Sequence, residues 1–490
     1  MSDPRTLSGG GTSLDPADWD GLRALGHRML DDMIAHLASL RDQPVWRPMP
    51  APLRAELRQP LPRQGEGADQ AYAAFGRLVQ PYATGNLHPR FMGWVHGGGN
   101  PVGMLAELLA GALDANCGGR DHAPIEVERQ VIRWSAEMLG LPSDSAGLLV
   151  TGTSLANLIG VLVARTRALG PEVRTEGLRG APLTAYASAA AHSCIPRAMD
   201  MAGLGSAALR LIPCDAAHRI DTAALAAAIA ADRAAGLQPF LLVGTAGSVN
   251  TGAIDDLAAL ANTAAAEQLW FHVDAAFGAL AMLSPRLRPA FAGMERADSV
   301  AFDFHKWGQV PYDAGCIVVR DPAAALATFA QDADYLRREA RGLAGGAPWP
   351  CDLGPDLSRG FRALKVWMTL IAYGGDRLGA VAETSCAVAR HLAARITREP
   401  ALELVAPVPL NIVCFRLRAD DDGGDRLNAD LAADLQEAGI AAPSTTRVGG
   451  RLAIRAAIVN HRTEPADADA LIDALLAAAR RRGVPLGTTP

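Results

Sequence analysis

Short apolar runs alternate with helix-like segments over residues 88–370, and this alternation restricts the possible fold more than any other feature of the chain. The runs hold four to seven apolar residues, as in "AGLLVTG", "PFLLVGTAG" and "SVAFDF". Runs of this length that alternate with helices are typical of a mostly parallel sheet covered by helices on both faces. We therefore expect an α/β fold in which ligands bind at the carboxyl ends of the strands.

The segments on either side of this region predict two smaller units. Helical spacing over residues 15–42 indicates an amphipathic helix, and a proline-rich connector follows, "QPVWRPMPAPLRAELRQPLPRQGEG". Because proline removes a backbone donor, we expect this connector to be an extended strap without regular helix. The predicted organisation is an N-terminal helical arm and strap (1–87), a large domain (88–370) and a small C-terminal α/β domain (371–490).

Composition limits the kind of protein and its partners. The 490-residue chain is 49% hydrophobic and 20% charged, and its net charge of −6 gives no basic surface for nucleic acid. Its apolar runs are interrupted before the roughly 20 residues of a membrane span, and the N-terminus shows no secretory signal, so we expect a cytoplasmic protein. Seven scattered cysteines without CxxC pairs indicate reduced thiols and no metal site.

Lysine is scarce in this chain: Lys306 and Lys365 stand against 44 arginines. Lys306 follows the predicted strand "SVAFDF" and comes directly after His305. Burying an unpaired ammonium is costly, which favours the neutral amine that attacks a carbonyl group. An arginine is unable to form a Schiff base, so a catalytic role explains why a lysine stands here. The alternative is an ordinary lysine at the edge of the sheet.

Three more polar groups follow predicted strands. The strand-end carboxylate of Asp274 in "HVDAAFGA" needs a partner such as a protonated pyridine nitrogen, unless it caps the next helix. Thr153 and Ser154 in "VTGTSLANL" lie at a helix start, which suits a phosphate group but is also an ordinary capping position. His192 is either a ring that stacks on a cofactor or an ordinary surface histidine. Together with Lys306, these groups describe a pocket for pyridoxal phosphate.

The order of the motifs "TGTSLAN", "AHS", "HVDAAFG" and "DFHKW" closely resembles the group II pyridoxal-phosphate-dependent amino acid decarboxylases, the family of aromatic-L-amino-acid decarboxylase. The resemblance includes "HPRFMGW", "RGFRALKVW" and "RLAIRAAIVNHRT" and covers nearly the whole chain. It implies the α/β fold type I of pyridoxal-phosphate enzymes, which is aspartate-aminotransferase-like, with a mostly parallel seven-stranded sheet in the large domain. It also implies a homodimer with shared active sites, whose N-terminal arm wraps the partner.

The resemblance further implies a role for each matching residue. Lys306 forms the internal aldimine with pyridoxal 5′-phosphate, Asp274 pairs with the pyridinium nitrogen, and His192 stacks on the ring near the substrate carboxylate. Ala276 packs on the ring as well. The implied phosphate contacts are Thr153, Ser154, Ser248 and His305. The implied reaction converts an L-amino acid to its amine and CO2 through a quinonoid.

One departure from the family pattern leaves the product open. Family members with aromatic substrates carry a loop tyrosine that protonates the reacting carbon, whereas the matching segment here, residues 337–361, contains no tyrosine. Gly345, Gly346 and Pro348 suggest a flexible loop tip, with Trp349 as its anchor. Protonation by another group, such as His192, Cys351 or water, gives an amine. Reaction with oxygen gives an aldehyde, ammonia and hydrogen peroxide, the outcome that loss of the tyrosine is associated with in the family.

The predicted substrate pocket is more polar than that of the aromatic-specific members. The segments "FMGWVHGGGNP" and "LDANCGGRDHAP" supply its candidate residues, which are Trp94, His96, Asn116 and Arg120. Such a lining suits a polar or acidic substrate side chain, but some of these residues equally suit salt bridges at a subunit interface. The sequence therefore predicts an aromatic or polar amino acid as substrate.

Overall fold

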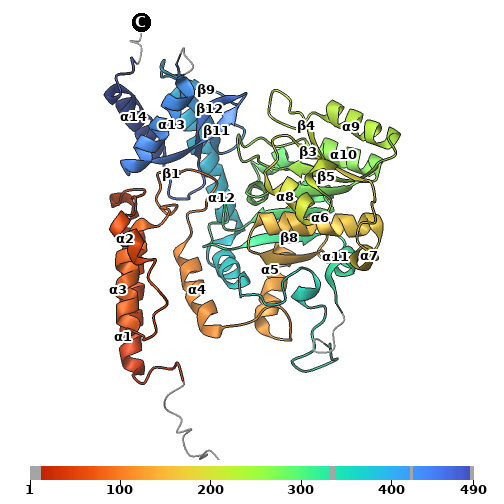
Figure 1. The fold of residues 1–490 in the computed structure, drawn as a ribbon, viewed down its shortest axis with the longest axis horizontal. Coiled ribbons are helices and arrows are strands. Elements are labelled where there is room, and N and C mark those ends of the chain that lie inside the picture. Colours follow the sequence, from red (N-terminus) through yellow and green to blue (C-terminus); the bar gives the residue numbers. More distant parts are fainter. Residues whose placement is uncertain (1–12, 332–336, 420–422, 486–490) are drawn as a thin grey trace, which may run out of the picture. The chain divides into compact units, whose positions relative to one another are not determined.

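The computed structural model of the chain describes residues 13–331, 337–419 and 423–485 (Figure 1). The chain divides into two compact units, Met1–Gly85 and Asn86–Pro490. The domain division predicted after residue 370 stays a proposal. It falls inside one long helix, α12 (Ala363–Thr397), close to Gly374, where a φ of +76° interrupts the helical conformation.

The N-terminal unit is helical. Its described elements are α1 (Trp19–Ala38), η1 (Leu40–Asp42), α2 (Ala51–Glu56), α3 (Ala68–Leu78) and η2 (Gln80–Tyr82). The helix predicted over residues 15–42 is confirmed, and the Asp18 side chain caps it by accepting two backbone N–H groups. The prediction that the proline-rich connector lacks regular helix was wrong, because α2 lies within it. Pro50 and Pro52 stand at the start of α2, where no backbone donor is needed, and residues 53–56 are helix-forming.

The second unit contains the predicted seven-stranded sheet, with strand order β2-β8-β7-β6-β5-β3-β4. Its strands are β2 (Ala146–Val150), β3 (Leu183–Ser188), β4 (Leu209–Ile212), β5 (Gln238–Thr245), β6 (Trp270–Asp274), β7 (Ser299–Asp303) and β8 (Gly315–Val319). β8 pairs antiparallel with both of its neighbours, and the other pairs are parallel. The mostly parallel sheet expected from the short apolar runs is therefore confirmed.

Helices cover both faces of this sheet (Figure 1). One face packs against α5 (Ala123–Leu139), α9 (Thr222–Ala234), α10 (Leu257–Glu267) and η4 (Gly278–Leu283). The other packs against α6 (Thr153–Leu169), α8 (Cys194–Met201) and α11 (Pro322–Phe329). Side chains along a strand point alternately to the two faces, so Leu242 joins the first hydrophobic cluster while Leu241 and Val243 join the second.

A second, five-stranded sheet lies in the C-terminal part, with strand order β1-β11-β12-β10-β9. Its strands are β1 (Phe91–Met92), β9 (Leu402–Leu404), β10 (Ile412–Leu417), β11 (Ala442–Val448) and β12 (Arg451–Ala457), and α13 (Gly424–Glu437) and α14 (Pro465–Arg481) pack against it. Other described elements are α4 (Pro101–Leu113), α7 (Val173–Glu176), η3 (Ser206–Ala208), η5 (Arg288–Phe291), η6 (Met294–Arg296) and η8 (Pro350–Asp352). The small C-terminal α/β fold is thus present, and β1, far away in sequence, adds a parallel edge strand to it.

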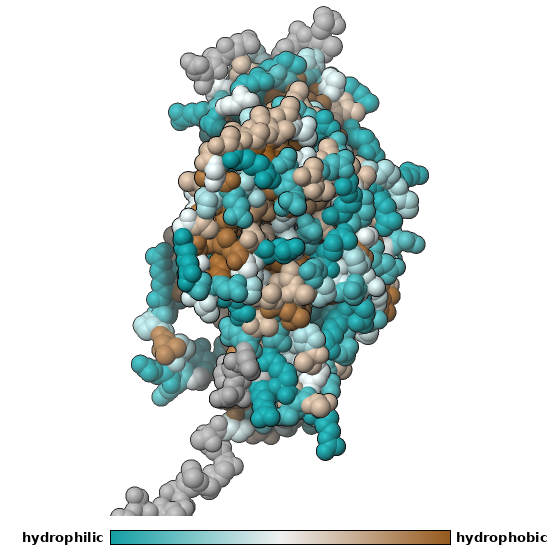
Figure 2. Space-filling model, turned by 90° about the vertical axis from the view of Figure 1, so that its right-hand side faces the viewer, coloured by the Kyte–Doolittle hydropathy of each residue, from teal (hydrophilic) through white to brown (hydrophobic). Residues whose placement is uncertain are grey.

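The surface of the protein carries both hydrophilic and hydrophobic side chains. Hydrophilic residues cover much of the face that Figure 2 shows, with smaller hydrophobic areas between them. None of the helices in the described ranges combines the length and hydrophobicity that a membrane span requires.

Candidate functional site

Most of the predicted site residues meet at one cavity beyond the carboxyl ends of β2, β6 and β7. Its volume is about 350 Å³, which lies in the range of small-molecule sites. The predicted residues that line it are Trp94, His96, Thr153, Ser154, His192, Asp274, Ala276, His305 and Lys306. Residues from distant parts of the sequence therefore converge at the strand ends on one cavity, and their roles toward a ligand stay predictions.

Lys306 is placed by the turn that follows β7. The Phe304 N–H donates to the Ala314 carbonyl at 2.8 Å, which folds the chain across the end of the sheet. The Lys306 Nζ lies 2.8 Å from Asp303 Oδ2, and the lysine side chain is 20% exposed. The amine therefore has a carboxylate partner and remains open to the cavity.

His305 lies near the same carboxylate oxygen. Its Nδ1 accepts the Ala314 N–H at 3.0 Å, so a neutral ring carries its proton on Nε2, which lies 3.6 Å from Asp303 Oδ2. Burial lowers the pKa of His305, while the charge of Asp303 acts in the opposite direction. Tyr312 packs on the His305 ring with centroids 4.1 Å apart, and the His96 ring stands edge-on to Tyr312 at 5.8 Å. One wall of the cavity is therefore aromatic.

Asp274 ends β6 at the floor of the cavity. The side chain is buried, and Oδ1 accepts the Ala276 N–H at 3.2 Å. Burial raises the pKa of this carboxyl group, while the charges of Lys306 and His192 act to lower it. A bound cation at this carboxylate would replace the solvation that burial removes.

His192 lies between β3 and α8. Its Nδ1 accepts the Cys194 N–H at 3.1 Å, which leaves Nε2 as the protonated nitrogen of a neutral ring. The atoms packed around the ring disfavour its charged form and lower the pKa of His192, although the Asp274 charge opposes this. His192 is thus able to stack in the cavity as a neutral ring with one N–H to donate.

The start of α6 supplies anion-binding groups. Gly152 precedes the helix without a side-chain cap, and it fits only because Gly315 on β8 also lacks a side chain: a Cβ there would lie 2.4 Å from the Gly152 Cα. The hydroxyl oxygens of Thr153 and Thr245 are buried, line the cavity and have no hydrogen-bond partner among the described residues. Thr153 begins α6 and Thr245 ends β5, and unpartnered hydroxyl donors at a helix start and a neighbouring strand end fit a phosphate group. The residues present therefore fit pyridoxal phosphate.

Three predicted site residues lie elsewhere in the described chain. The Ser248 hydroxyl bonds to Thr251 Oγ1 at 3.0 Å and does not line this cavity in the described chain. Asn116 Oδ1 accepts the backbone N–H groups of Gly118 and Arg359, both at 3.0 Å. Arg120 lies over the ring of a tryptophan in the tyrosine-free loop, 4.7 Å from its centroid. Their roles stay predictions.

That tryptophan is Trp349, and the prediction that it anchors the loop is confirmed. Trp349 is 1% exposed, its indole N–H donates to Gly345 O at 2.7 Å, and the Arg338 guanidinium also lies over its ring, 4.4 Å from the centroid. Tyr335, the tyrosine that precedes this loop in sequence, lies outside the described residues.

Sequence reasoning missed Asp303 and Tyr312. Asp303 Oδ1 accepts the Thr153 N–H at 2.7 Å, so this residue connects the lysine to the start of α6. Burial raises the pKa of Asp303, but the charges of Lys306 and His305 outweigh it and bring the pKa below its usual range. A signal was available, because Asp303 is a strand-end carboxylate like Asp274. Tyr312 offered none, because its position depends on how the segment after β7 folds back.

His272, two residues before Asp274 on β6, leads to a prediction about acid stability. Complete burial lowers the pKa of His272 to about 3, against 6.5 in an exposed histidine. Between pH 6.5 and pH 3, His272 binds a proton in the unfolded chain but stays neutral in the folded chain. The free energy of unfolding therefore decreases as pH falls through this range. Between pH 7 and pH 5 the wild type should lose about 2 kcal/mol more unfolding free energy than His272→Gln. Urea unfolding measures this, and parallel pH profiles for the two proteins would contradict it.

Comparisons with known proteins identify the family of the chain. Residues 50–418 match the family described as "Pyridoxal-dependent decarboxylase conserved domain". The chain is 31% identical to an aromatic-L-amino-acid decarboxylase of Bacillus atrophaeus, over 90% of this chain and 92% of the relative. It is 28% identical to a phenylacetaldehyde synthase of Arabidopsis thaliana, over 92% and 94% of the two chains.

Solved structures show the same fold. The crystal structure of Oryza sativa TDC with PLP and tryptamine superposes with a TM-score of 0.88 at 28% identity, over 96% of this chain and 100% of that chain. The fold is therefore type I of the pyridoxal-phosphate enzymes, and pyridoxal phosphate is the cofactor. The protein is a pyridoxal-phosphate-dependent carboxy-lyase, and the chain belongs to the pyridoxal-dependent decarboxylase family.

Proposed function

We propose that this protein decarboxylates an L-amino acid with an aromatic or polar side chain to the amine and CO2. The observation that carries the proposal is the cavity that Lys306, Asp274, His192 and the start of α6 share. Bound pyridoxal phosphate supplies an acceptor for the electron pair that departing CO2 leaves on the substrate. The names of its relatives support an aromatic substrate, and the aromatic wall of His96 and Tyr312 suits one.

Each site residue has a task in this proposal. The primary amine of Lys306 would hold the cofactor, and the Asp274 carboxylate would keep a positive charge on the ring nitrogen. The hydroxyl groups at the start of α6, with His305, would hold the phosphate. His192 would lie against the ring, where its Nε2–H is available to protonate the carbon that loses CO2. Cys351, the other side chain considered for this step, does not line the cavity within the described residues.

A second candidate is decarboxylation coupled to oxidation, which gives an aldehyde, ammonia and hydrogen peroxide. Two observations favour keeping it: residues 337–361 contain no tyrosine, and a phenylacetaldehyde synthase is among the relatives. In this case no side chain would protonate the reacting carbon before oxygen reaches it.

One experiment distinguishes these two functions. The holoenzyme is incubated with tryptophan, tyrosine and phenylalanine, and with glutamate and aspartate as acidic comparators, in the presence and absence of oxygen. We expect an aromatic substrate to give amine and CO2 at equal rates in both atmospheres. Hydrogen peroxide and aldehyde in amounts equal to CO2, formed only with oxygen, would replace the first proposal by the second.

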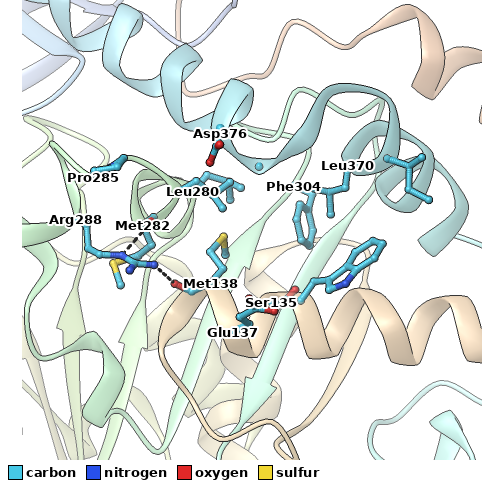
Figure 3. Close-up of a pocket in the computed structure, with 14 residues that line it drawn as sticks. Ser135, Glu137, Met138, Leu280, Met282, Pro285, Arg288, Phe304, Leu370 and Asp376 are labelled. Atoms are coloured by element: carbon cyan, nitrogen blue, oxygen red, sulfur yellow. Dashed lines mark hydrogen bonds between the residues drawn. The ribbon is translucent and has the colours of Figure 1, made fainter.

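We also propose a homodimer with shared active sites, in which Asn116 and Arg120 of one chain would reach the partner's cavity. An exposed apolar stripe and a cavity of mixed lining in the second unit support it. Leu105, Leu108, Leu109 and Leu113 form an exposed stripe on α4. A separate cavity of about 760 Å³, lined by side chains from α5, η4 and α12, includes Leu280 and Leu370 (Figure 3).

The N-terminal unit offers a further apolar surface. On α1, the side chains of Trp19, Leu22, Met29 and Ile34 are exposed, as expected for an amphipathic helix that packs against a partner. Sedimentation equilibrium should give twice the mass of the chain. A monomer with full activity would contradict the shared active sites.

A further inference from the structure

The proposed role of Asp274 requires its carboxyl group to be ionised. Burial raises the pKa of this carboxyl group. A carboxyl group that kept its proton would be unable to stabilise a positive charge on the cofactor's ring nitrogen. The charges of Lys306 and His192 act against this effect of burial, and contacts on the protein side of Asp274 add to them where they donate hydrogen bonds.

A chain of hydrogen bonds begins at Trp270, at the other end of β6. The Trp270 indole N–H donates to Ser299 Oγ at 2.8 Å, and Ser299 Oγ lies 2.7 Å from His272 Nδ1. His272 Nε2 lies 2.7 Å from Asn157 Oδ1 on α6. Trp270, His272 and Asp274 alternate along β6, so their side chains point to the same face of the sheet.

The hydrogen-bond chain ends at the Asp274 carboxylate. Asn157 Nδ2 donates to Cys194 Sγ at 3.1 Å, and the Cys194 thiol donates to Asp274 Oδ2 at 4.0 Å. Burial raises the pKa of Cys194 to about 12, so the thiol keeps the proton that this last contact requires.

The chemistry of the groups fixes the direction of every bond. The Asn157 carbonyl oxygen only accepts, so a neutral His272 ring carries its proton on Nε2 and donates it to Asn157. His272 Nδ1 then accepts, and Ser299 donates its hydroxyl proton to it while accepting from the Trp270 indole. The Asn157 amide and the Cys194 thiol continue in the same direction. Every donor hydrogen therefore points toward Asp274, where such aligned dipoles stabilise negative charge.

Cys194 and Asp274 border the cavity, and the rest of this hydrogen-bond chain is packed inside the protein. Its members are all buried, with exposed fractions of at most 9%: Trp270, Ser299, His272, Asn157, Cys194 and Asp274. Gly160 on α6 makes room for the His272 ring, because a Cβ at this position would lie 2.6 Å from His272 Cε1. Buried hydrogen bonds act in a low dielectric, where aligned dipoles have their largest effect.

We propose that this hydrogen-bond chain holds Asp274 in its ionised form, which makes Cys194, Asn157 and His272 positioning residues for the reaction. The inference rests on the proposed function, because it assumes that Asp274 faces the ring nitrogen of the cofactor. It assigns a task to polar side chains of β6, α6 and α8 that do not themselves carry out the reaction.

The test uses holoenzyme loaded with pyridoxal phosphate that is isotopically labelled at its ring nitrogen. Solid-state nitrogen NMR then reports whether that nitrogen carries a proton. We expect the signal of a protonated nitrogen in the wild type and a shift toward the unprotonated signal in Cys194→Ala, together with a kcat about tenfold lower at unchanged KM. Cys194→Ser keeps a donor and should restore both. Trp270→Phe removes only the first donor, so its effect should have the same direction and a smaller size.

Cys386→Ala is the matched control, because Cys386 is also buried but lies on α12 and takes no part in the hydrogen-bond chain. It should keep the wild-type signal. An unchanged signal in Cys194→Ala, an equal shift in Cys386→Ala, or a larger shift in Trp270→Phe than in Cys194→Ala would overturn the inference. The NMR signal requires no turnover. A protein that shows the expected shifts but forms neither amine nor aldehyde would therefore overturn the proposed function and leave the inference standing.

Discussion

Replacing Lys306 by arginine is expected to abolish the visible absorbance of the bound cofactor and to lower turnover by at least ~10³-fold. The guanidinium keeps the positive charge and therefore the attraction to Asp303, whose carboxylate lies 2.8 Å from the lysine amine in the wild type. It is unable to form a Schiff base with a carbonyl group. This variant thus separates loss of the primary amine from loss of charge. Absorbance spectra and CO2 release measure the two effects.

Lys365 provides the matched control, because it is the other lysine of the chain. Its side chain is 4% exposed and pairs with Glu107. Lys365→Arg should keep both the absorbance band and turnover, with thermal stability as the property that changes. Persistence of the band in Lys306→Arg, or its loss in both variants, would remove Lys306 from the proposed site.

Replacing Asp274 by asparagine should lower turnover by about 10²–10³-fold, because a neutral amide is unable to stabilise a positive charge on the ring nitrogen. The visible band should persist, since Lys306 and the phosphate-binding groups are unchanged. The two variants therefore differ in kind: one loses the covalent attachment, and the other keeps it without the electrostatic support. Single-turnover kinetics and absorbance spectra on the same samples distinguish them.

Asp232→Asn controls for the loss of a buried carboxylate. Asp232 is 8% exposed, and it accepts hydrogen bonds from Tyr186 at 2.7 Å and from Arg210, away from the cavity. We expect this variant to lose stability and to keep its kcat. Equal losses of kcat in Asp232→Asn and Asp274→Asn would mean that Asp274 contributes only to folding.

Lys306 and Asp274 show how much of the site local sequence predicts. The positions of β6 and β7 and the polar residues at their ends were predictable, because apolar runs and their polar ends are local features of the sequence. The α2 helix was missed although its signal is also local, because the prolines around it were read as excluding helix throughout the connector. The four-residue edge strand β4 and the strand β1 depend on pairing with distant segments.

By itself, the sequence determined the sheet, the strand ends and the residue types that form the cofactor pocket, because periodicity and residue chemistry are local properties. Only the tertiary structure decided which strand ends are neighbours. The order β7-β6-β5 brings Asp274 beside the β7 turn, the antiparallel β8 brings Gly315 against the start of α6, and Asp303 reaches both Lys306 and Thr153. The hydrogen-bond chain to Asp274 likewise joins residues from two strands and two helices. Such contacts depend on long-range pairing and side-chain direction, which no local pattern in the sequence specifies.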